Sequence, residues 1–213
     1  MRLSIRPWLL PVMILSVASI TASQTEPAHK PVASKRYCQS DGGFCFKYPA
    51  SWTMLGEVFD GNGVVVAPPQ KQERALWDTI TVARIVPPPK SDEEPAGLNG
   101  VIEQATANLR AAGQAFETLQ RQQRTVDHKP AQMLKVRYHE KPTGHDWIEK
   151  MVFIEGPDNE IYSVALKCSP QNLSRLEPVL ARVLSSWTLP EPEVPEESAP
   201  KPSAPPAKAT PSH

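Results

Sequence analysis

Between residues 115 and 168 the chain contains four strand-like runs that are separated only by short connections rich in turn-forming residues. The runs span roughly 115–126, 132–139, 147–155 and 160–168, and Pro142, Gly144, Gly156 and Pro157 stand between them. Parallel neighbouring strands need a crossover of a dozen or more residues, so connections this short force consecutive strands to be antiparallel. The sequence therefore predicts an antiparallel meander in the second half of the folded region.

Further strands and two helices complete the predicted pattern. Strands are expected over 44–48, 52–59, 63–67 and 79–86, where apolar residues alternate or run between turn signals. Apolar residues at helical spacing predict one helix from Leu98 to a stop at Gly113, and a second one that Ser169 caps and Pro170 opens. The expected fold class is α+β, with a single antiparallel sheet of about seven or eight strands covered by two main helices.

Two motifs at the ends of this region resemble a known fold group. An aromatic strand runs into a Tyr-Pro-x-x-Trp corner, and the last helix closes on a Val-Leu-Ser-Ser-Trp sequence, which are residues 44–52 and 183–187. Together with the order of the elements, these motifs resemble the photosystem extrinsic protein PsbP and the bacterial DcrB-like proteins over residues 36–189. The resemblance implies an α+β domain in an accessory, assembly or ligand-holding role, and it supplies no catalytic residue.

The two ends of the chain differ in composition from the region between them. Arg2 and Arg6 precede a short apolar stretch and then small residues, which is the layout of a cleavable signal peptide over 1–23, although an uncleaved membrane anchor is the alternative. Residues 24–35 form a polar leader, and 8 of the 24 prolines lie in 190–213. This last segment has too few apolar residues to fold and is expected to be a disordered Pro-rich tail. The protein is therefore expected to be secreted or periplasmic.

The charge balance limits the classes of partner. Lys and Arg together number 23 and so do Asp and Glu, which leaves no basic surplus for nucleic acid. Membrane contact is expected only if the signal segment is uncleaved. The expected partner is an unidentified protein of the cell envelope or the extracellular space.

Three cysteines provide the most specific chemical prediction. In a hairpin with a two-residue turn at Asp41-Gly42, Cys38 and Cys45 would be a hydrogen-bonded pair with Cα atoms about 5.5 Å apart, which permits a disulfide. Loop-closure entropy predicts that a Cys45–Cys168 bridge would stabilise the fold more than a Cys38–Cys45 bridge, but it does not decide which bridge forms. We expect a Cys38–Cys45 disulfide and a free, buried Cys168.

No sequence pattern points to a catalytic centre, a cofactor or a metal. A hydrolase elbow, a phosphate-binding glycine loop and a zinc-protease helix motif are all missing from the sequence. The residues His139, Glu140, His145 and Asp146 flank one turn and could together hold a divalent ion, but solvated polar residues are the simpler interpretation. Gln120–Arg124 with Lys135 and Arg137 could form a mild basic patch for an acidic ligand, or only a solvated strand face.

The leading hypothesis is therefore an exported, non-enzymatic accessory domain that acts through protein–protein contacts. The alternative is a small-ligand or lipid carrier with a pocket between sheet and helix lined by some of Trp52, Trp77 and Trp147. An enzyme of unrecognised type is the third hypothesis.

Overall fold

The structure, a computed structural model, describes residues 33–39, 43–70, 76–85 and 97–189. All of these lie in one unit that spans Val32–His213. The predicted signal peptide over 1–23, the Pro-rich tail over 190–213 and nearly all of the polar leader lie outside the described residues. The first strand begins at Ser34, two residues before the expected start of the folded region.

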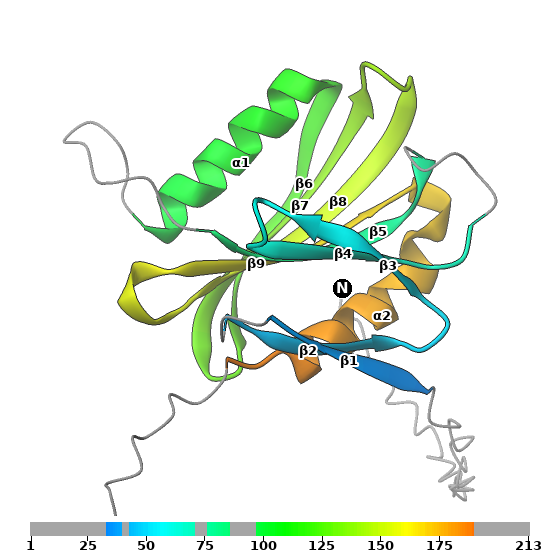
Figure 1. Ribbon diagram of the computed structural model, residues 1–213. Coiled ribbons are helices and arrows are strands. Elements are labelled where there is room, and N and C mark those ends of the chain that lie inside the picture. The colour runs from blue at the N-terminus through cyan, green and yellow to red at the C-terminus, as the bar shows by residue number, and fades with distance from the viewer. Residues whose placement is uncertain (1–32, 40–42, 71–75, 86–96, 190–213) are drawn as a thin grey trace, which may run out of the picture. The chain divides into compact units, whose positions relative to one another are not determined.

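The described part of the chain contains a seven-stranded antiparallel sheet in the order β3-β4-β5-β9-β8-β7-β6 (Figure 1). The predicted meander forms one half of this sheet, and three of its four strands are longer than expected because the short turns let the strands pair up to the hairpin tips. The strands are β3 (Thr53–Val58), β4 (Gly63–Ala67), β5 (Thr79–Ile85), β6 (Gly113–Val126), β7 (Lys129–Glu140), β8 (His145–Glu155) and β9 (Ile161–Cys168).

The first hairpin forms a separate two-stranded sheet, β1 (Ser34–Cys38) and β2 (Cys45–Pro49), instead of joining the large sheet. The backbone of Cys45 exchanges hydrogen bonds of 2.8 and 2.9 Å with Thr188, so the free edge of β2 is used by the chain that follows the last helix. Phe44, Phe46 and Tyr48 are buried in the core beneath this small sheet. The α+β class is confirmed, with the predicted strands divided between two sheets.

Cys38 and Cys45 form the expected disulfide, and Cys168 is a free, buried cysteine. The predicted backbone pairing was wrong in one respect. Gln39 N donates to Phe44 O, so the hydrogen-bonded pair lies next to the cysteines and not at them. Cys38 and Cys45 are therefore a non-hydrogen-bonded pair, which explains why their Cα atoms are 4.1 Å apart instead of the expected 5.5 Å.

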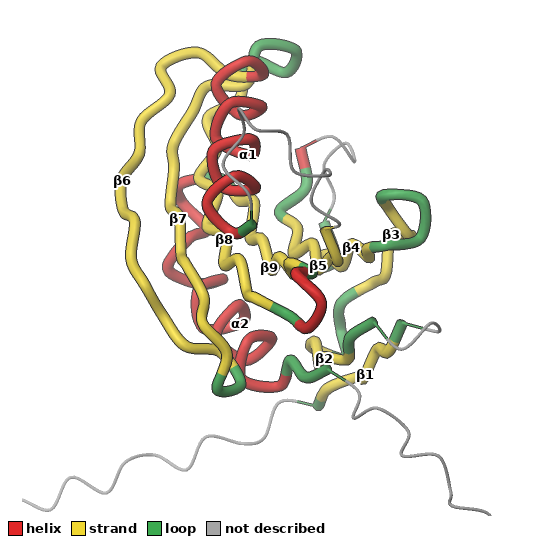
Figure 2. The backbone as a smooth tube through the Cα atoms, turned by 90° about the vertical axis from the view of Figure 1, so that its left-hand side faces the viewer, coloured by secondary structure: helices red, strands yellow, loops and turns green. Residues whose placement is uncertain are grey.

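Two helices cover opposite faces of the large sheet, as Figure 2 shows from the side. Helix α1 (Leu98–Ala112) buries Val101 and Ile102 against the face that carries Val136 and Trp147. Helix α2 (Leu173–Ser186) packs on the other face, in a core that includes Val152, Ile154, Val164, Leu166, Leu176, Leu180 and Val183. Burying each large apolar side chain contributes about 1.5–3 kcal/mol, so these two cores hold the layers together.

Gly113 ends α1 as predicted, where the backbone becomes extended, and a side chain at this position would collide with Tyr138 at 2.9 Å. The expected cap of the second helix was wrong. Ser169 makes no capping hydrogen bond with its side chain. Instead the buried carboxylate of Asp78 accepts hydrogen bonds from Ser169 N (3.0 Å) and Asn172 Nδ2 (2.7 Å). A residue remote in sequence thus anchors both ends of this turn, which spans Pro170–Asn172.

Candidate functional site

The larger of two surface depressions that flank β6 lies between the start of α1, the β6–β7 hairpin and β8, with a volume of about 610 Å³. Two strands and a helix meet here because β6 and β7 extend past the first turn of α1 (Figure 2). Its walls are mainly amide, hydroxyl and charged side chains, which are Asn99, Gln123, Arg124, Thr125, His128, Gln132 and Glu155. We call this depression the α1-side groove.

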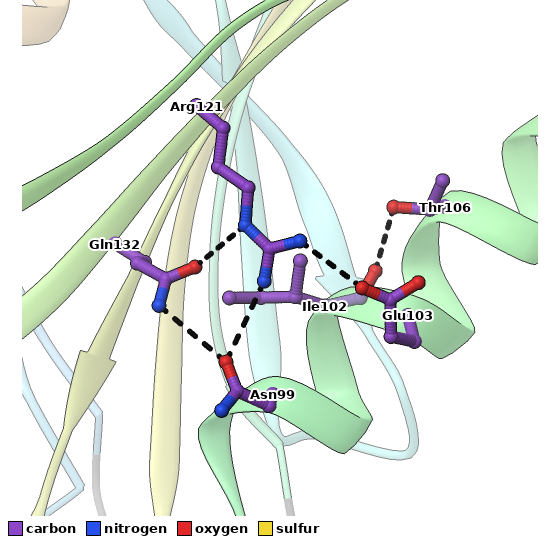
Figure 3. Close-up of polar contacts among 6 residues, drawn as sticks. All are labelled: Asn99, Ile102, Glu103, Thr106, Arg121 and Gln132. Atoms are coloured by element: carbon purple, nitrogen blue, oxygen red, sulfur yellow. Dashed lines mark hydrogen bonds and ion pairs between the residues drawn. The ribbon is translucent and has the colours of Figure 1, made fainter.

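A polar network joins α1 to β6 beside this groove (Figure 3). The Arg121 guanidinium donates to Gln132 Oε1 at 3.0 Å and to Glu103 Oε1 at 3.1 Å, with a longer contact to Asn99. Both members of the Arg121–Glu103 ion pair are about half exposed, so the pair contributes less than about 1 kcal/mol to stability. The network orients one groove wall more than it stabilises the fold.

The second depression, of about 370 Å³, lies against the same strand on the α2 side. Residues 122–126 of β6 and Asp127 of the following turn line it on one side, and Ala181, Leu184 and Ser185 line it from α2. We call it the α2-side groove. Residues 122–126 of β6 are thus bordered by a groove on each face of the sheet.

Two basic side chains at these grooves have no fixed partner. Arg124 and His128 are exposed, and neither forms an ion pair or a side-chain hydrogen bond within the described ranges. Arg121, by contrast, is already paired with Glu103. The grooves therefore offer hydrogen-bonding groups and one permanent unpaired cation, which suits recognition of a polar or acidic partner.

The most strongly interacting charges lie elsewhere, under the C-terminal half of α1. Glu140 accepts hydrogen bonds from Lys167 Nζ (2.7 Å), Thr143 Oγ1 (2.6 Å) and Trp147 Nε1 (3.1 Å). Lys167 Nζ also lies 4.5 Å from the centre of the Trp147 ring. Burial alone would raise the pKa of Glu140, but the hydrogen bonds from Lys167, Thr143 and Trp147 and the Lys167 charge outweigh it and lower that pKa.

Glu149 lies next to this group, and its pKa is shifted in the direction opposite to that of Glu140. Burial raises the pKa of the Glu149 carboxyl, and the Lys167 charge and the hydrogen bond from Tyr138 offset the rise only in part. Tyr138 donates that bond at 3.1 Å, and burial together with the Glu149 charge raises the Tyr138 pKa. Shifted pKa values are typical of catalytic sites, but here each group is engaged by another side chain of the same cluster. The cluster contains no serine or cysteine nucleophile.

The four residues considered for metal binding do not converge. His139 pairs with Asp146 across β7 and β8, and Glu140 pairs with His145. Neighbouring positions on a strand point to opposite faces, so each face receives one histidine and one carboxylate. His139 Nδ1 lies 2.9 Å from Asp146 Oδ1, while His145 stacks on Trp147 at 5.2 Å. Among the described residues no group of three metal-ligating side chains occurs.

The predicted basic patch is also divided by the sheet. Arg121 is on the α1 side, where it contacts Glu103. Lys135 is on the α2 side, where it and Lys150 lie 3.6 and 2.9 Å from Glu177 of α2. Of the residues proposed for this patch, Gln123 and Arg124 line both depressions.

Two other predicted features are changed or clarified by the structure. Trp52 belongs to the core on the α2 side and Trp147 to the core on the α1 side, so these two tryptophans cannot line one and the same carrier pocket. Cys168 is completely buried, and burial together with the Asp78 and Glu177 charges raises the pKa of its thiol to about 12. Such a thiol is not activated for nucleophilic chemistry.

Sequence reasoning missed Asn99, His128 and Gln132 as groove residues. A signal was present for β6 itself. Residues 120–124 are all polar, and a strand with no apolar residue at alternate positions cannot have a buried face, which predicts a strand at the edge of the sheet. No sequence signal placed Asn99 of α1 beside that edge.

None of the helices in the described ranges combines the length and the apolar character needed to cross a membrane. The fold and the grooves together define an α+β domain with one helix on each face of its main sheet and a polar, open surface along one edge strand. No protein-family sequence model matches the chain, and no curated protein has a significantly similar sequence.

Solved structures identify the fold as PsbP-like. Cyanobacterial PsbP (CyanoP) from Synechocystis sp. PCC 6803 is 14% identical with a TM-score of 0.52, and the match covers 76% of this chain and 95% of CyanoP. LpqN, involved in cell envelope biogenesis of Mycobacterium tuberculosis, is 14% identical with a TM-score of 0.53, covering 76% of this chain and 93% of LpqN. At this identity the likeness concerns the fold, which confirms the predicted resemblance to the PsbP-like and DcrB-like group.

Proposed function

We propose that the protein is an exported accessory domain that binds a partner protein through the edge of its sheet formed by β6, and that it performs no catalysis. Three observations support export. The sequence of residues 1–23 has the layout of a signal peptide. Cys38 and Cys45 form a disulfide, which is typical of oxidising compartments. LpqN, which shares the fold, is involved in cell envelope biogenesis.

The distribution of polar groups carries the binding part of the proposal. The ionisable side chains around Glu140 and Glu149 are tied to one another by hydrogen bonds, whereas Arg124 and His128 lie unpaired in open grooves. A catalytic site needs reactive groups that face a space for substrate, and a binding surface needs accessible groups with unused hydrogen-bonding capacity. The β6 edge has the arrangement of a binding surface.

Two measurements on the native host test this proposal. Cell fractionation should place the protein outside the cytoplasm with Cys38 and Cys45 oxidised. Affinity capture from the envelope or medium should recover the same partner with the full mature chain and with a chain that ends at Leu189, because the partner contacts the folded region. A cytoplasmic protein with reduced cysteines, or turnover of substrates in a broad hydrolase and transferase panel, would contradict it.

A further inference from the structure

The second half of β6 forms a regular and unoccupied sheet edge within the described part of the molecule. Residues 120–126 pair with 129–135 of β7 without a break, whereas the first half of β6 contains two shifts of register. No strand lies on the other side of β6 in the sheet order. Bulges protect an edge from further pairing, so the first half is blocked and the second half is not.

The turn after β6 determines which backbone groups face outward. Asp127 and His128 both have positive φ (48° and 60°), as the two central residues of a type I′ turn do. In such a hairpin the flanking residues, here Val126 and Lys129, form a hydrogen-bonded pair, and these pairs recur at every second position. The backbone N–H and C=O groups of Arg121, Gln123 and Thr125 are therefore directed away from β7, toward solvent.

The two grooves lie where the side chains of an added strand would go. Successive side chains of a strand point to opposite faces of a sheet. A strand placed beside residues 120–126 would thus direct alternate side chains into the α1-side and the α2-side grooves. A sheet edge bordered by a groove on each face has the geometry of recognition by strand addition.

The charges of the grooves indicate what kind of strand would fit. The segment from Gln120 to Val126 contains two arginines and no acidic residue. The Arg124 side chain shares the α2-side groove with the apolar Leu184 and with Asp127 of the turn, while the α1-side groove presents the amides of Gln123 and Gln132, with Glu155 of β8 on its far wall. Small hydroxyl or amide side chains suit the α1 side, and acidic side chains on the α2 side can pair with Arg124.

We propose that Gln120–Val126 is a strand-addition site for an extended, acidic segment of the partner protein. This inference rests on the proposed function, since it specifies the partner chemistry at the same surface. Backbone hydrogen bonds to Arg121, Gln123 and Thr125 supply the register, and Arg124 selects acidic side chains. A basic segment in the same position would place like charges beside Arg124, which is unfavourable.

Fluorescence anisotropy with the full mature chain tests the site, using a labelled nonapeptide of alternating threonine and glutamate as the probe. The wild-type chain should bind this peptide, and an analogue N-methylated at alternate amides should bind at least about tenfold more weakly because its donors are removed. Arg124→Glu should weaken binding of the threonine–glutamate peptide at least about tenfold and strengthen binding of a threonine–lysine peptide. Gln123→Pro, which removes an outward-facing N–H at an edge that tolerates proline, should also weaken it about tenfold.

Arg36→Glu, at an exposed arginine of β1, is the matched control and should change affinity less than about twofold. Thermal melting of each variant within a few degrees of wild type shows that the fold is retained. The inference is overturned if the wild-type chain does not bind the peptide, or if Arg124→Glu and Gln123→Pro bind it as wild type does. If the wild-type chain captures a partner but does not bind the peptide, this inference alone is overturned. If the wild-type chain captures no partner, the proposed function is overturned.

Discussion

The Nζ atom of Lys167 lies 2.7 Å from Oε1 of Glu140 and 4.5 Å from the centre of the Trp147 ring, so one lysine joins the charged cluster under α1 to the core of the sheet. The same lysine charge acts on Glu149, whose pKa is raised while that of Glu140 is lowered. As pH rises, the contribution of Glu140 to the stability of the fold increases and that of Glu149 decreases, so the two contributions can be measured separately.

Glu149→Gln should stabilise the protein at neutral and higher pH. A carboxyl whose pKa is raised on folding favours the folded state below its unfolded pKa, and this stability is lost as pH rises through the folded pKa. A neutral glutamine retains an acceptor for Tyr138 without the cost of a buried charge. We expect the free energy of unfolding to rise by about 1 kcal/mol at pH 8 and the difference to shrink toward pH 4. Equal effects at both pH values would contradict this.

Glu140→Gln should have the opposite effect. A carboxyl whose pKa is lowered on folding contributes stability above its unfolded pKa, and that contribution is lost as pH falls through the folded pKa. The substitution also removes the charge that pairs with Lys167. Denaturant unfolding at pH 7 should show a loss of about 1–3 kcal/mol, with a smaller loss near pH 4. Glu103→Gln, which removes an exposed ion pair with Arg121, is the control and should cost less than about 1 kcal/mol.

Asp78→Ala should destabilise the protein much more than Ser169→Ala. The Asp78 carboxylate accepts hydrogen bonds from Ser169 N and Asn172 Nδ2, whereas the Ser169 side chain caps nothing. We expect Asp78→Ala to cost about 2–3 kcal/mol because buried donors lose their partner, and Ser169→Ala to cost less than about 0.5 kcal/mol. Chemical denaturation of both variants measures the two losses of unfolding free energy. Similar losses would show that the Asp78 hydrogen bonds do not hold this turn.

The single free thiol should be unreactive in the folded protein. Cys168 is completely buried and burial raises its pKa to about 12, so at pH 8 almost no thiolate is available to attack an aromatic disulfide reagent. The reagent should detect no thiol in native protein and one thiol per chain in guanidinium without reductant. Rapid reaction of the native protein would disprove the burial of Cys168.

Replacing Cys38 and Cys45 together by serine should cost about 2.5 kcal/mol, as expected for closing a short loop with a disulfide. The fold should persist, because Phe44 and Phe46 are buried independently of the bridge. Differential scanning calorimetry of the double variant, with reduced wild-type protein for comparison, measures the loss. No change in either sample would mean that the bridge does not constrain the unfolded chain.

Features set by local patterns could be predicted from the sequence. Short turns determined the meander, helical spacing determined α1 to its end at Gly113, and hairpin register determined the Cys38–Cys45 bridge. Features that depend on distant residues could not. Asp78 anchors a turn that begins 91 positions later, and Trp52 and Trp147 lie on opposite faces of a sheet whose strand order the sequence did not specify.

The candidate site shows both situations. Because β7 and β8 continue to the tip of their hairpin, strand alternation alone places the side chains of His139 and Glu140 on opposite faces of the sheet. The polar run of residues 120–124 already indicated an edge strand. The grooves, however, arise from the packing of α1 and α2 on opposite faces beside β6, which joins residues as distant as Asn99 and Ala181 around one strand.

Site-specific photo-cross-linking in intact host cells tests the central claim most directly. A photoreactive amino acid at Gln123 on β6 should yield a cross-linked product of one defined mass with an envelope or extracellular protein, and the same amino acid at Arg36 on β1 should yield none. An identical set of products from both positions, or no product from Gln123, would contradict the account that this domain works by binding a partner along β6.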